Sequence, residues 1–337
     1  MDTCRVAILG AGSWGTAFAN LVAPHVKEVC LWSHSDEVAQ GISELHKNPR
    51  YIKDCKLAEN VSATTSFQDC LEGARYIVIA TPSSFIRQVC ESCSPYIDKA
   101  TPILVLTKGI EAHSGLLMCD LVADVVGGRQ RLACLSGPNH AEEIGQNKIS
   151  AAVVGAYELG VAKAFQEIVS SRNFRTYISQ DIRGVEVCSA AKNIIAIACG
   201  AAWRLGVGDN CLAVLMTRGL AEIGRIVSAT GGDPMTCMGL AGMGDLMATC
   251  TSPHSRNRSF GVALIDGVSL EEYEAQTHMV VEGAKACASV YELAQNYEIQ
   301  IPITQAVWSM LYDRVGPQEA IDSLLERFPQ MEFYDFK

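Results

Sequence analysis

An apolar segment that runs directly into three spaced glycines constrains this chain more than any other feature. Residues 4–9 read Cys-Arg-Val-Ala-Ile-Leu, and Gly10, Gly12 and Gly15 follow in the pattern Gly-x-Gly-x-x-Gly. This spacing predicts a strand, a tight turn at Gly10, a close approach of a pyrophosphate to the backbone at Gly12, and close helix packing at Gly15. The first amides of the helix have no partner within it and would point at the phosphates. They belong to Ser13, Trp14 and Gly15. The segment therefore predicts a dinucleotide-binding turn, with a purely structural glycine turn as the alternative.

Length and composition bound the class of protein. The chain has 337 residues, 49% of them hydrophobic, which is enough for two domains of ordinary size. Its net charge of −10 argues against a nucleic-acid partner, because phosphate backbones select basic surfaces. Charges or glycines interrupt the apolar stretches, and the first residues lack the pattern of a secretory signal. We expect a soluble cytoplasmic protein without a membrane anchor.

Fourteen cysteines are scattered along the chain rather than concentrated as in a small disulfide scaffold. We expect reduced and mostly buried thiols. Cys90 and Cys93 form a Cys-x-x-Cys motif, but no second pair and no nearby histidines accompany it. Helix packing is therefore favoured over a zinc or redox site, and no metal is expected.

The first half of the sequence alternates apolar, β-branched runs with helical patterns, as a doubly wound, Rossmann-type parallel sheet requires. The predicted strands are Arg5–Leu9, Glu28–Trp32, Tyr76–Thr81, Ile103–Thr107, Leu132–Ser136 and Ala151–Gly155. Ligands of such sheets bind beyond the carboxyl ends of the strands. Candidate binding segments there are Thr81–Ser84, Thr107–Gly109 and Ser136–Ala141.

After Asp181 the strand patterns stop and helical patterns follow one another. The predicted helices are Gly184–Leu205, Leu212–Thr230, Met235–Met247, Val281–Tyr297, Ile303–Val315 and Gln318–Phe328. Prolines stand near several expected helix starts and glycines near several expected ends. We therefore predict a dinucleotide-binding domain at residues 1–180 and an all-helical substrate-binding and catalytic domain at residues 181–337.

The end of the second predicted strand bears on the choice of cofactor. An acid that binds the ribose of NAD is expected there, about 20 residues beyond the glycines. Ser33 and His34 could instead donate to a 2′-phosphate, while Asp36 and Glu37 fit the first turn of a helix. This pattern favours NADPH with NADH tolerated. The alternative, in which Asp36 binds the ribose, stays open.

Lys192 stands in an otherwise apolar or small-residue helical segment, with no carboxylate at the neighbouring helical positions. Burial of a lysine lowers its pKa and suits it to proton transfer near neutral pH. Reduction of a ketone needs a proton for the developing alkoxide, so Lys192 is a candidate general acid. Asn193 could hold this lysine or the cofactor amide. A structural lysine in a salt bridge and a structural asparagine are the alternatives.

Residues 239–258 combine glycines, a single acid and a basic cluster. Asp245 could orient Lys192 or accept a hydrogen bond from a substrate hydroxyl. Ser255 could cap a helix whose first residues, Arg256 and Asn257, would bind a phosphate. Lys108, at a strand end, could add positive charge over the substrate or the cofactor. A solvated basic helix start is the alternative for the cluster.

Together these segments resemble the bacterial soluble type of nicotinamide-dependent glycerol-3-phosphate dehydrogenases. The resemblance spans nearly the whole chain, and its most specific part is Gly239 through Phe260. The other matching segments are Gly10–Ala17, Thr107–Ile110, Ser136–Pro138, Lys192–Ile194 and Thr217–Glu222. The resemblance implies a 6-phosphogluconate dehydrogenase-like arrangement of a Rossmann domain and a helical domain. It also implies the reversible, NAD(P)H-dependent reduction of dihydroxyacetone phosphate to sn-glycerol 3-phosphate, which supplies glycerophospholipid synthesis.

The resemblance also implies roles for individual residues, with Lys192 as the proton donor. The substrate contacts it implies fall on Lys108, Gly137, Asn139, Lys192, Asp245, Ser255, Arg256 and Asn257. The cofactor contacts it implies fall on Ser13, Trp14, His34, Lys108, Ala141, Arg256, Val280 and Glu282. Asn139 departs from the serine or threonine usual in this pattern, and the position of His34 varies with arginine. A homodimer is plausible, although no residue indicates it.

Two other functions are kept as alternatives. One is a different hydroxyacid dehydrogenase with the same two-domain plan, against which the predicted phosphate cluster at Arg256 and Asn257 argues. The other is a non-catalytic dinucleotide sensor, which would need only the first half of the chain.

Overall fold

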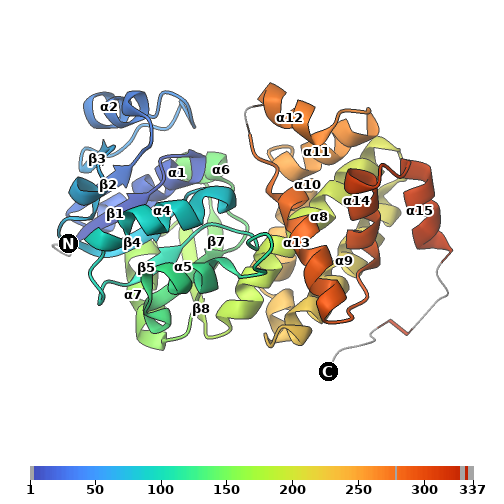
Figure 1. The fold of residues 1–337 in the computed structure, drawn as a ribbon. Coiled ribbons are helices and arrows are strands. Elements are labelled where there is room, and N and C mark those ends of the chain that lie inside the picture. The colour runs from blue at the N-terminus through green and yellow to red at the C-terminus, as the bar shows by residue number, and fades with distance from the viewer. Residues whose placement is uncertain (1–3, 278, 327–330, 333–337) are drawn as a thin grey trace. The chain divides into compact units, whose positions relative to one another are not determined.

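The computed structural model describes residues 4–277, 279–326 and 331–332, and it divides into two compact units. The first unit contains residues up to Thr107 together with Met118–Ile182, and the second contains Lys108–Leu117 and the residues from Arg183 onward. The predicted boundary after residue 180 takes no account of the Lys108–Leu117 excursion. Figure 1 shows the strands in the first unit and the helices that make up the second.

The first unit is built on one eight-stranded sheet in the described part of the chain, in the order β3-β2-β1-β4-β5-β6-β7-β8. The strands are β1 (Arg5–Leu9), β2 (Glu28–Trp32), β3 (Val61–Thr64), β4 (Ala74–Ile79), β5 (Ile103–Val105), β6 (Leu132–Ser136), β7 (Ser150–Ala156) and β8 (Phe174–Ser179). Neighbouring strands pair in parallel except β6 and β7, which are antiparallel. The predicted Rossmann-type, doubly wound sheet is confirmed, and the β6–β7 pair is its one departure from parallel pairing among the described strands.

The sequence analysis did not predict the two strands at the edges of the sheet, β3 and β8. Both are edge strands, and edge strands are covered on fewer sides than central ones. In β8 the first four residues alternate between buried and exposed, and β3 has a single fully buried residue, Val61. Neither strand therefore has the continuous apolar run that marks the central strands.

Two groups of helices surround this sheet (Figure 1). In one group α1 contacts α6 and α7, and in the other α4 contacts α3 and α5. The helices of the unit are α1 (Ser13–Val22), α2 (Asp36–Leu45), α3 (Phe67–Leu71), α4 (Ile86–Cys93), α5 (Met118–Val126), α6 (Ala141–Gly145) and α7 (Leu159–Val169). Short 3₁₀ turns lie at Ala23–His25, Ser83–Phe85, Ser94–Tyr96 and Arg129–Arg131. Burial of Phe18, Phe165 and Phe174 shows where the apolar core of this unit lies.

The regular elements in the described residues of the second unit are all helices. Its helices are α8 (Ile182–Arg204), α9 (Asp209–Ala229), α10 (Asp245–Thr251), α11 (Arg256–Ile265), α12 (Leu270–Thr277), α13 (Glu282–Asn296), α14 (Pro302–Tyr312) and α15 (Pro317–Leu325). α12 was not predicted. The prediction of a single helix over Met235–Met247 is wrong. The chain there forms three successive elements: a 3₁₀ helix η5 (Pro234–Met238), a π-helix η6 (Leu240–Gly244) and the start of α10. The end of the predicted helix Gln318–Phe328 lies outside the described residues.

α8 is the central helix of this unit. In the described residues it is the one helix long and apolar enough to span a membrane, and its apolar window is wholly buried, as in a core helix. Two glycines allow α11 to pack closely on it: a Cβ at Gly200 would lie 2.0 Å from the Arg258 carbonyl oxygen, and one at Gly261 would lie 2.1 Å from that of Ile197. This contact holds the first turns of α11 against the C-terminal part of α8.

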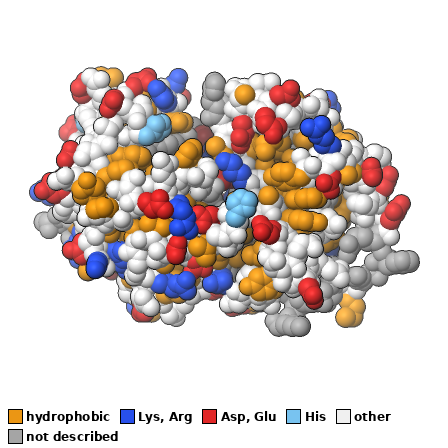
Figure 2. Space-filling model, in the orientation of Figure 1, with side chains coloured by type: hydrophobic (Ala, Val, Ile, Leu, Met, Phe, Trp, Pro, Cys, Tyr) orange, Lys and Arg blue, Asp and Glu red, His pale blue; other side chains and the backbone are white. Residues whose placement is uncertain are grey.

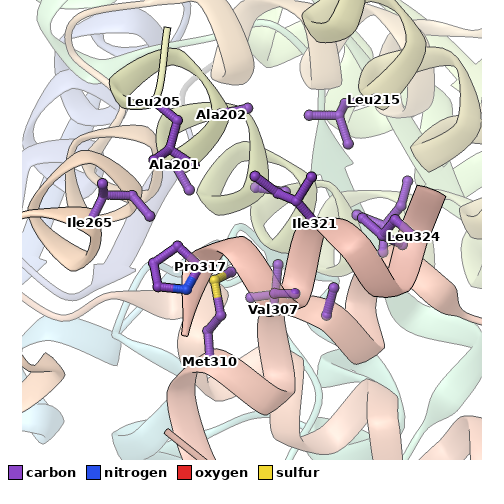
Figure 3. A pocket seen from close by; sticks show the side chains of 14 residues that line it. Ala201, Ala202, Leu205, Leu215, Ile265, Val307, Met310, Pro317, Ile321 and Leu324 are labelled. Carbon is purple, nitrogen blue, oxygen red and sulfur yellow. The ribbon is translucent and has the colours of Figure 1, made fainter. Parts of the chain in front are cut away.

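An apolar cavity of about 50 Å³ lies among α8, α9, α11, α14 and α15 (Figure 3). Its lining is aliphatic, with Leu205, Ile321 and Met310 among the labelled side chains. Apolar cavities that bind a small aromatic molecule are about three times larger. This cavity is therefore smaller than one that holds such a molecule, and aliphatic side chains line it.

Thirteen of the fourteen cysteines are buried, and Cys211 is half-buried. This confirms the prediction that the cysteines are mostly buried. Cys90 and Cys93 lie together on α4, where burial raises the pKa of each thiol to about 12. In the described residues no cluster of His, Cys, Asp and Glu has the arrangement of a metal site.

Candidate active site

The ammonium group of Lys192 is the centre of a buried polar cluster in the second unit. Lys192 lies in the middle of α8 and is 5% exposed. Its Nζ donates to Asp245 Oδ1, and it also donates to Thr249 Oγ1 at 2.6 Å. The lysine that the sequence singled out is thus buried and held by two partners from α10.

Asp245 lies between two lysines. It is the first residue of α10, directly after the π-helix η6, and is 3% exposed. While Oδ1 accepts from Lys192, Oδ2 accepts from Lys108 Nζ at 2.8 Å. Lys108 begins the Lys108–Leu117 excursion, which is anchored in the second unit by the hydrogen bond from Ser289 Oγ to the Ile110 carbonyl. Two cations and one anion therefore share this site, and its net charge is positive.

The environment shifts the pKa values of the central pair. Burial lowers the pKa of the Lys192 ammonium to about 8; the Asp245 carboxylate opposes this shift and Lys108 adds to it. Burial acts to raise the pKa of Asp245, but Lys108 and Lys192 outweigh it and hold the pKa below its usual value. Near neutral pH the cluster thus contains an ionised aspartate and a lysine that can release its proton.

Sequence reasoning missed Thr249. This residue is 3% exposed, and its hydroxyl donates to the backbone carbonyl of Asp245 at 2.6 Å while accepting from Lys192. A threonine within a helix commonly makes this bond to the carbonyl four residues earlier. The spacing of Thr249 four positions after Asp245 was the available signal, because both side chains then lie on the same face of α10.

A second polar network joins three helices next to this cluster. Asn257 on α11 donates from Nδ2 to Asn193 Oδ1 on α8 at 2.9 Å, and its Oδ1 accepts from the Gly283 amide of α13 at 2.9 Å. A Cβ at Gly283 would lie 2.7 Å from the Asn193 carbonyl oxygen, so α13 approaches α8 closely here. Asn193 therefore holds Asn257 directly.

The start of α11 has the predicted cap. Ser255 is buried, and its Oγ accepts from the Arg258 amide at 3.2 Å. Arg256, the first residue of the helix, is exposed. The helix therefore begins with a capping serine and places an exposed guanidinium at its positive end, an arrangement that suits an anion.

The glycine turn of the first unit fits the phosphates of a dinucleotide. Gly10 has φ +123°, and a Cβ at Gly15 would lie 1.9 Å from the Gly10 carbonyl oxygen, so α1 packs directly on the turn. At Gly12, by contrast, a Cβ would meet nothing within 4 Å. Gly12 precedes α1 without a side-chain cap, which leaves space at the amides of Ser13, Trp14 and Gly15.

At the end of β2 the candidate residues differ in exposure. Ser33 is buried, and its Oγ is engaged with the backbone of Ser35. His34 is exposed, and Asp36 is exposed in the first turn of α2. Of these side chains, His34 and Asp36 are accessible to a ligand, while Ser33 bonds within the turn.

The predicted residues after β6 also lie in the first unit. Gly137 has φ +149°, and a Cβ there would lie 2.7 Å from the Ala151 carbonyl oxygen. Asn139 is half-buried, and its Nδ2 is buried without a hydrogen-bond partner. Ala141 is the first residue of α6. A buried amide nitrogen without a partner is uncommon in proteins, so Asn139 has an N–H group available for a further hydrogen bond.

Comparison with known proteins identifies the family. Residues 5–162 match the family described as the NAD-dependent glycerol-3-phosphate dehydrogenase N-terminus, and residues 181–322 match the corresponding C-terminus. The chain belongs to the NAD-dependent glycerol-3-phosphate dehydrogenase family.

Individual members of this family resemble the chain over nearly its full length. The glycerol-3-phosphate dehydrogenase (NAD(P)+) of Nocardia farcinica is 43% identical over 330 residues, which cover 96% of this chain and 98% of that protein. The enzyme of the same name from Thermobifida fusca is 42% identical over 332 residues, with coverage of 98% and 99%. The crystal structure of glycerol-3-phosphate dehydrogenase from Coxiella burnetii superposes with a TM-score of 0.91 at 38% identity, covering 96% of this chain and 99% of that one.

The candidate residues of this glycerol-3-phosphate dehydrogenase family member fall into separate groups. Lys108, Lys192 and Asp245 form one cluster, and Ser255, Arg256 and Asn257 form the start of α11. Glu282 opens α13, and Val280 stands two residues before it. The glycine turn, His34, Gly137, Asn139 and Ala141 belong to the first unit.

Proposed function

We propose that this chain reduces dihydroxyacetone phosphate to sn-glycerol 3-phosphate with NADPH or NADH, reversibly, and that Lys192 delivers the proton. Membership of the family supports an NAD(P)-dependent oxidoreductase with this substrate. The observation that carries the role of Lys192 is its buried ammonium, held by Asp245 and Thr249. A different hydroxyacid dehydrogenase and a non-catalytic sensor are both disfavoured by the family match.

Lys192 acts as the general acid in this proposal. When bound, the reduced nicotinamide supplies the hydride for C2 of the substrate. Lys192 Nζ donates a proton to the C2 oxygen, and in the reverse direction the neutral amine takes that proton back. Asp245 and Thr249 accept the other ammonium hydrogens and thereby aim the proton. They are positioning residues for the lysine.

The charge of the cluster assists the same step. Lys108 adds a second cation beside Asp245, so negative charge that develops on the C2 oxygen meets a site of net positive charge. The site is buried, which strengthens these interactions relative to water. Asp245 also has the acceptor capacity to bind a hydroxyl of the substrate.

The substrate phosphate is proposed to bind at the start of α11. Arg256 supplies an exposed guanidinium there, and Ser255 and Asn257 lie on either side of it. The Asn257 carboxamide has a second N–H beyond the one given to Asn193. Gly137 and Asn139 are proposed as further substrate contacts, with the unpartnered Asn139 Nδ2 as the donor.

The dinucleotide is proposed to bind at the glycine turn through Gly10, Gly12 and Gly15 and the amides of Ser13 and Trp14. The close packing at Gly15 and the open space at Gly12 support this assignment. The remaining proposed cofactor contacts are His34, Lys108, Ala141, Arg256, Val280 and Glu282. On this basis we propose that residues 1–180 bind the dinucleotide and that residues 181–337 bind the substrate and carry the catalytic lysine.

The cellular setting is proposed from the reaction and the composition. The product is the backbone of glycerophospholipids, and we propose a cytoplasmic enzyme without a membrane anchor that supplies their synthesis. We also propose a homodimer. Large apolar side chains are exposed on the second unit, such as Trp203, Val214 and Met247, and Figure 2 shows hydrophobic side chains on its visible face. Light scattering after size-exclusion chromatography tests the dimer, and cell fractionation tests the location.

The reaction is tested by the loss of nicotinamide absorbance with dihydroxyacetone phosphate, comparing NADPH with NADH. Lys192→Ala should abolish turnover while cofactor binding persists. Lys163→Ala, which removes an exposed lysine of α7, is the matched control and should behave as wild type. Wild-type protein that reduces only carboxylated ketones would favour another hydroxyacid dehydrogenase. Cofactor binding without turnover of any ketone would favour the sensor.

A further inference from the structure

The loop after α2 is tied to the glycine turn by Asn48, which is 1% exposed. Its Nδ2 donates to the Ala11 carbonyl at 2.9 Å and to Thr16 Oγ1 at 2.8 Å. Its Oδ1 accepts from the amides of Arg50 and Tyr51, each at 3.0 Å. One buried side chain thus connects the turn that receives the phosphates with the backbone that carries Arg50.

The same loop also packs against α2. A Cβ at Gly41 would lie 2.8 Å from Pro49 Cδ, so the helix and the loop are in close contact. The Lys47 amide donates to the Gly41 carbonyl at 3.3 Å. The loop is therefore held on two sides, and the position of Arg50 is well defined.

The guanidinium of Arg50 lies at the first turn of α2. Its Nη2 and Nε donate to Glu37 Oε2 at 2.6 and 2.9 Å. Glu37 is the second residue of α2, three residues after His34 at the end of β2. Both side chains of the pair are half exposed, at 50% for Arg50 and 60% for Glu37. Arg50 therefore stands between the glycine turn and the end of β2 and remains accessible to a ligand.

In a doubly wound sheet, the location of Arg50 bears on recognition of the cofactor. The 2′ position of the adenosine ribose is recognised near the end of the second strand, where an acid suits a hydroxyl and a nearby arginine suits a phosphate. The guanidinium fork matches a phosphate in two parallel hydrogen bonds. In this chain the arginine and an acid are both present and are paired to each other.

We propose that Arg50 binds the 2′-phosphate of NADPH and that Glu37 is the partner which the phosphate replaces. The inference rests on the proposed function only in taking a nicotinamide dinucleotide as the ligand. The 2′-phosphate brings more negative charge than the carboxylate, so it competes well for the guanidinium. With NADH the Arg50–Glu37 pair stays intact. Arg50 thereby sets the preference between the two cofactors, and Asn48 is the positioning residue that holds it there.

The test measures dissociation constants of NADPH and NADH for the full-length protein, by calorimetry and without substrate. Arg50→Gln should weaken NADPH binding about tenfold, as expected for loss of a charge-assisted pair, and should change NADH binding less than about twofold. Arg50→Lys keeps the charge and should recover part of the NADPH affinity. Glu37→Gln removes the competing partner and should strengthen NADPH binding by about two- to threefold.

Arg204→Gln is the matched control, because Arg204 is similarly exposed and paired with Asp266 at 2.7 Å in the second unit. It should leave both constants unchanged. Equal weakening of NADPH and NADH by Arg50→Gln, or no weakening of either, would overturn the assignment. Failure of the wild type to reduce dihydroxyacetone phosphate would overturn the proposed function and leave these binding constants interpretable.

Discussion

Substitution of Asp245 by asparagine removes the carboxylate that lies between the Lys192 and Lys108 ammonium groups. In the wild type this carboxylate opposes the effect of burial on Lys192, whose pKa is about 8. A hydrogen bond between charged groups contributes about 1.5–3 kcal/mol, so its loss should lower the pKa of Lys192 by roughly 1–2 units. The Lys192 side chain, the proposed proton donor, would then be largely neutral at physiological pH.

The consequence for the rate follows from the protonated fraction. At pH 7.5 this fraction falls from about 0.8 for a pKa of about 8 to roughly 0.03–0.24 for a pKa of about 6–7. Reduction of dihydroxyacetone phosphate should therefore slow by about 3- to 25-fold at pH 7.5 and recover toward pH 6. The wild-type rate of reduction should fall above pH about 8, where the lysine loses its proton, and the rate of oxidation should rise through the same pH.

The assay is kcat/KM for reduction as a function of pH at saturating NADPH, with wild type and Asp245→Asn compared directly. Titration of the substrate phosphate affects both proteins equally and cancels from the comparison. The NADPH dissociation constant and the thermal unfolding midpoint serve as controls for folding. A uniform loss of rate with an unchanged midpoint of the high-pH limb would refute the argument, because Asp245 would then act without changing the pKa of Lys192.

Three further substitutions test other parts of the structure. Thr249→Val removes the hydroxyl that accepts a hydrogen bond from Lys192 at 2.6 Å. The value of kcat should fall several-fold with little change in the NADPH dissociation constant. A larger effect on KM than on kcat would contradict a positioning role. Gly15→Ala places a Cβ 1.9 Å from the Gly10 carbonyl oxygen, so it should lower the unfolding temperature and weaken the binding of both NADPH and NADH. A stable variant that binds both cofactors normally would count against the geometry of this turn. Glu222→Ala deletes a buried carboxylate that accepts hydrogen bonds from the Ile303 amide and from the amide and hydroxyl of Thr304, at 2.5–2.9 Å. Its loss should destabilise the protein by about 2–4 kcal/mol, measured as a lower midpoint of urea unfolding.

The central part of the sheet was predictable because its strands are buried on both faces. β1, β2 and β6 have the predicted bounds, since continuous apolar runs mark strands of this kind. The edge strands β3 and β8 escaped the same reasoning, because polar residues such as Ser62, Thr64 and Arg175 interrupt their apolar runs. Apolar periodicity likewise cannot distinguish one helix from the succession of η5, η6 and α10. The close contact at Gly242, where a Cβ would lie 2.1 Å from the Cys237 carbonyl oxygen, accompanies the irregular winding there.

Individual residues of the candidate site were predictable from the sequence, but the contacts between them were not. Lys192 stood out because it is a charge within an apolar helical segment, and Asp245 because it is a single acid among glycines. Thr249 and Asn48 gave no comparable signal, since a threonine in a helix and an asparagine in a loop are ordinary residues. Their importance depends on what they contact, and those contacts join residues as far apart in sequence as Lys192 and Thr249, or Asn48 and Ala11.

The sequence by itself determined the class of cofactor and predicted which residue is most suited to proton transfer. Both depend on local properties, namely the spacing of Gly10, Gly12 and Gly15 and the apolar surroundings of Lys192 along its helix. Only the tertiary structure decided which groups hold that lysine. It moves Lys108 into the helical unit and brings it to within 2.8 Å of Asp245, 137 positions away. The pKa of a buried group depends on burial and on charges a few ångströms away, and these are properties of packing that no local pattern contains.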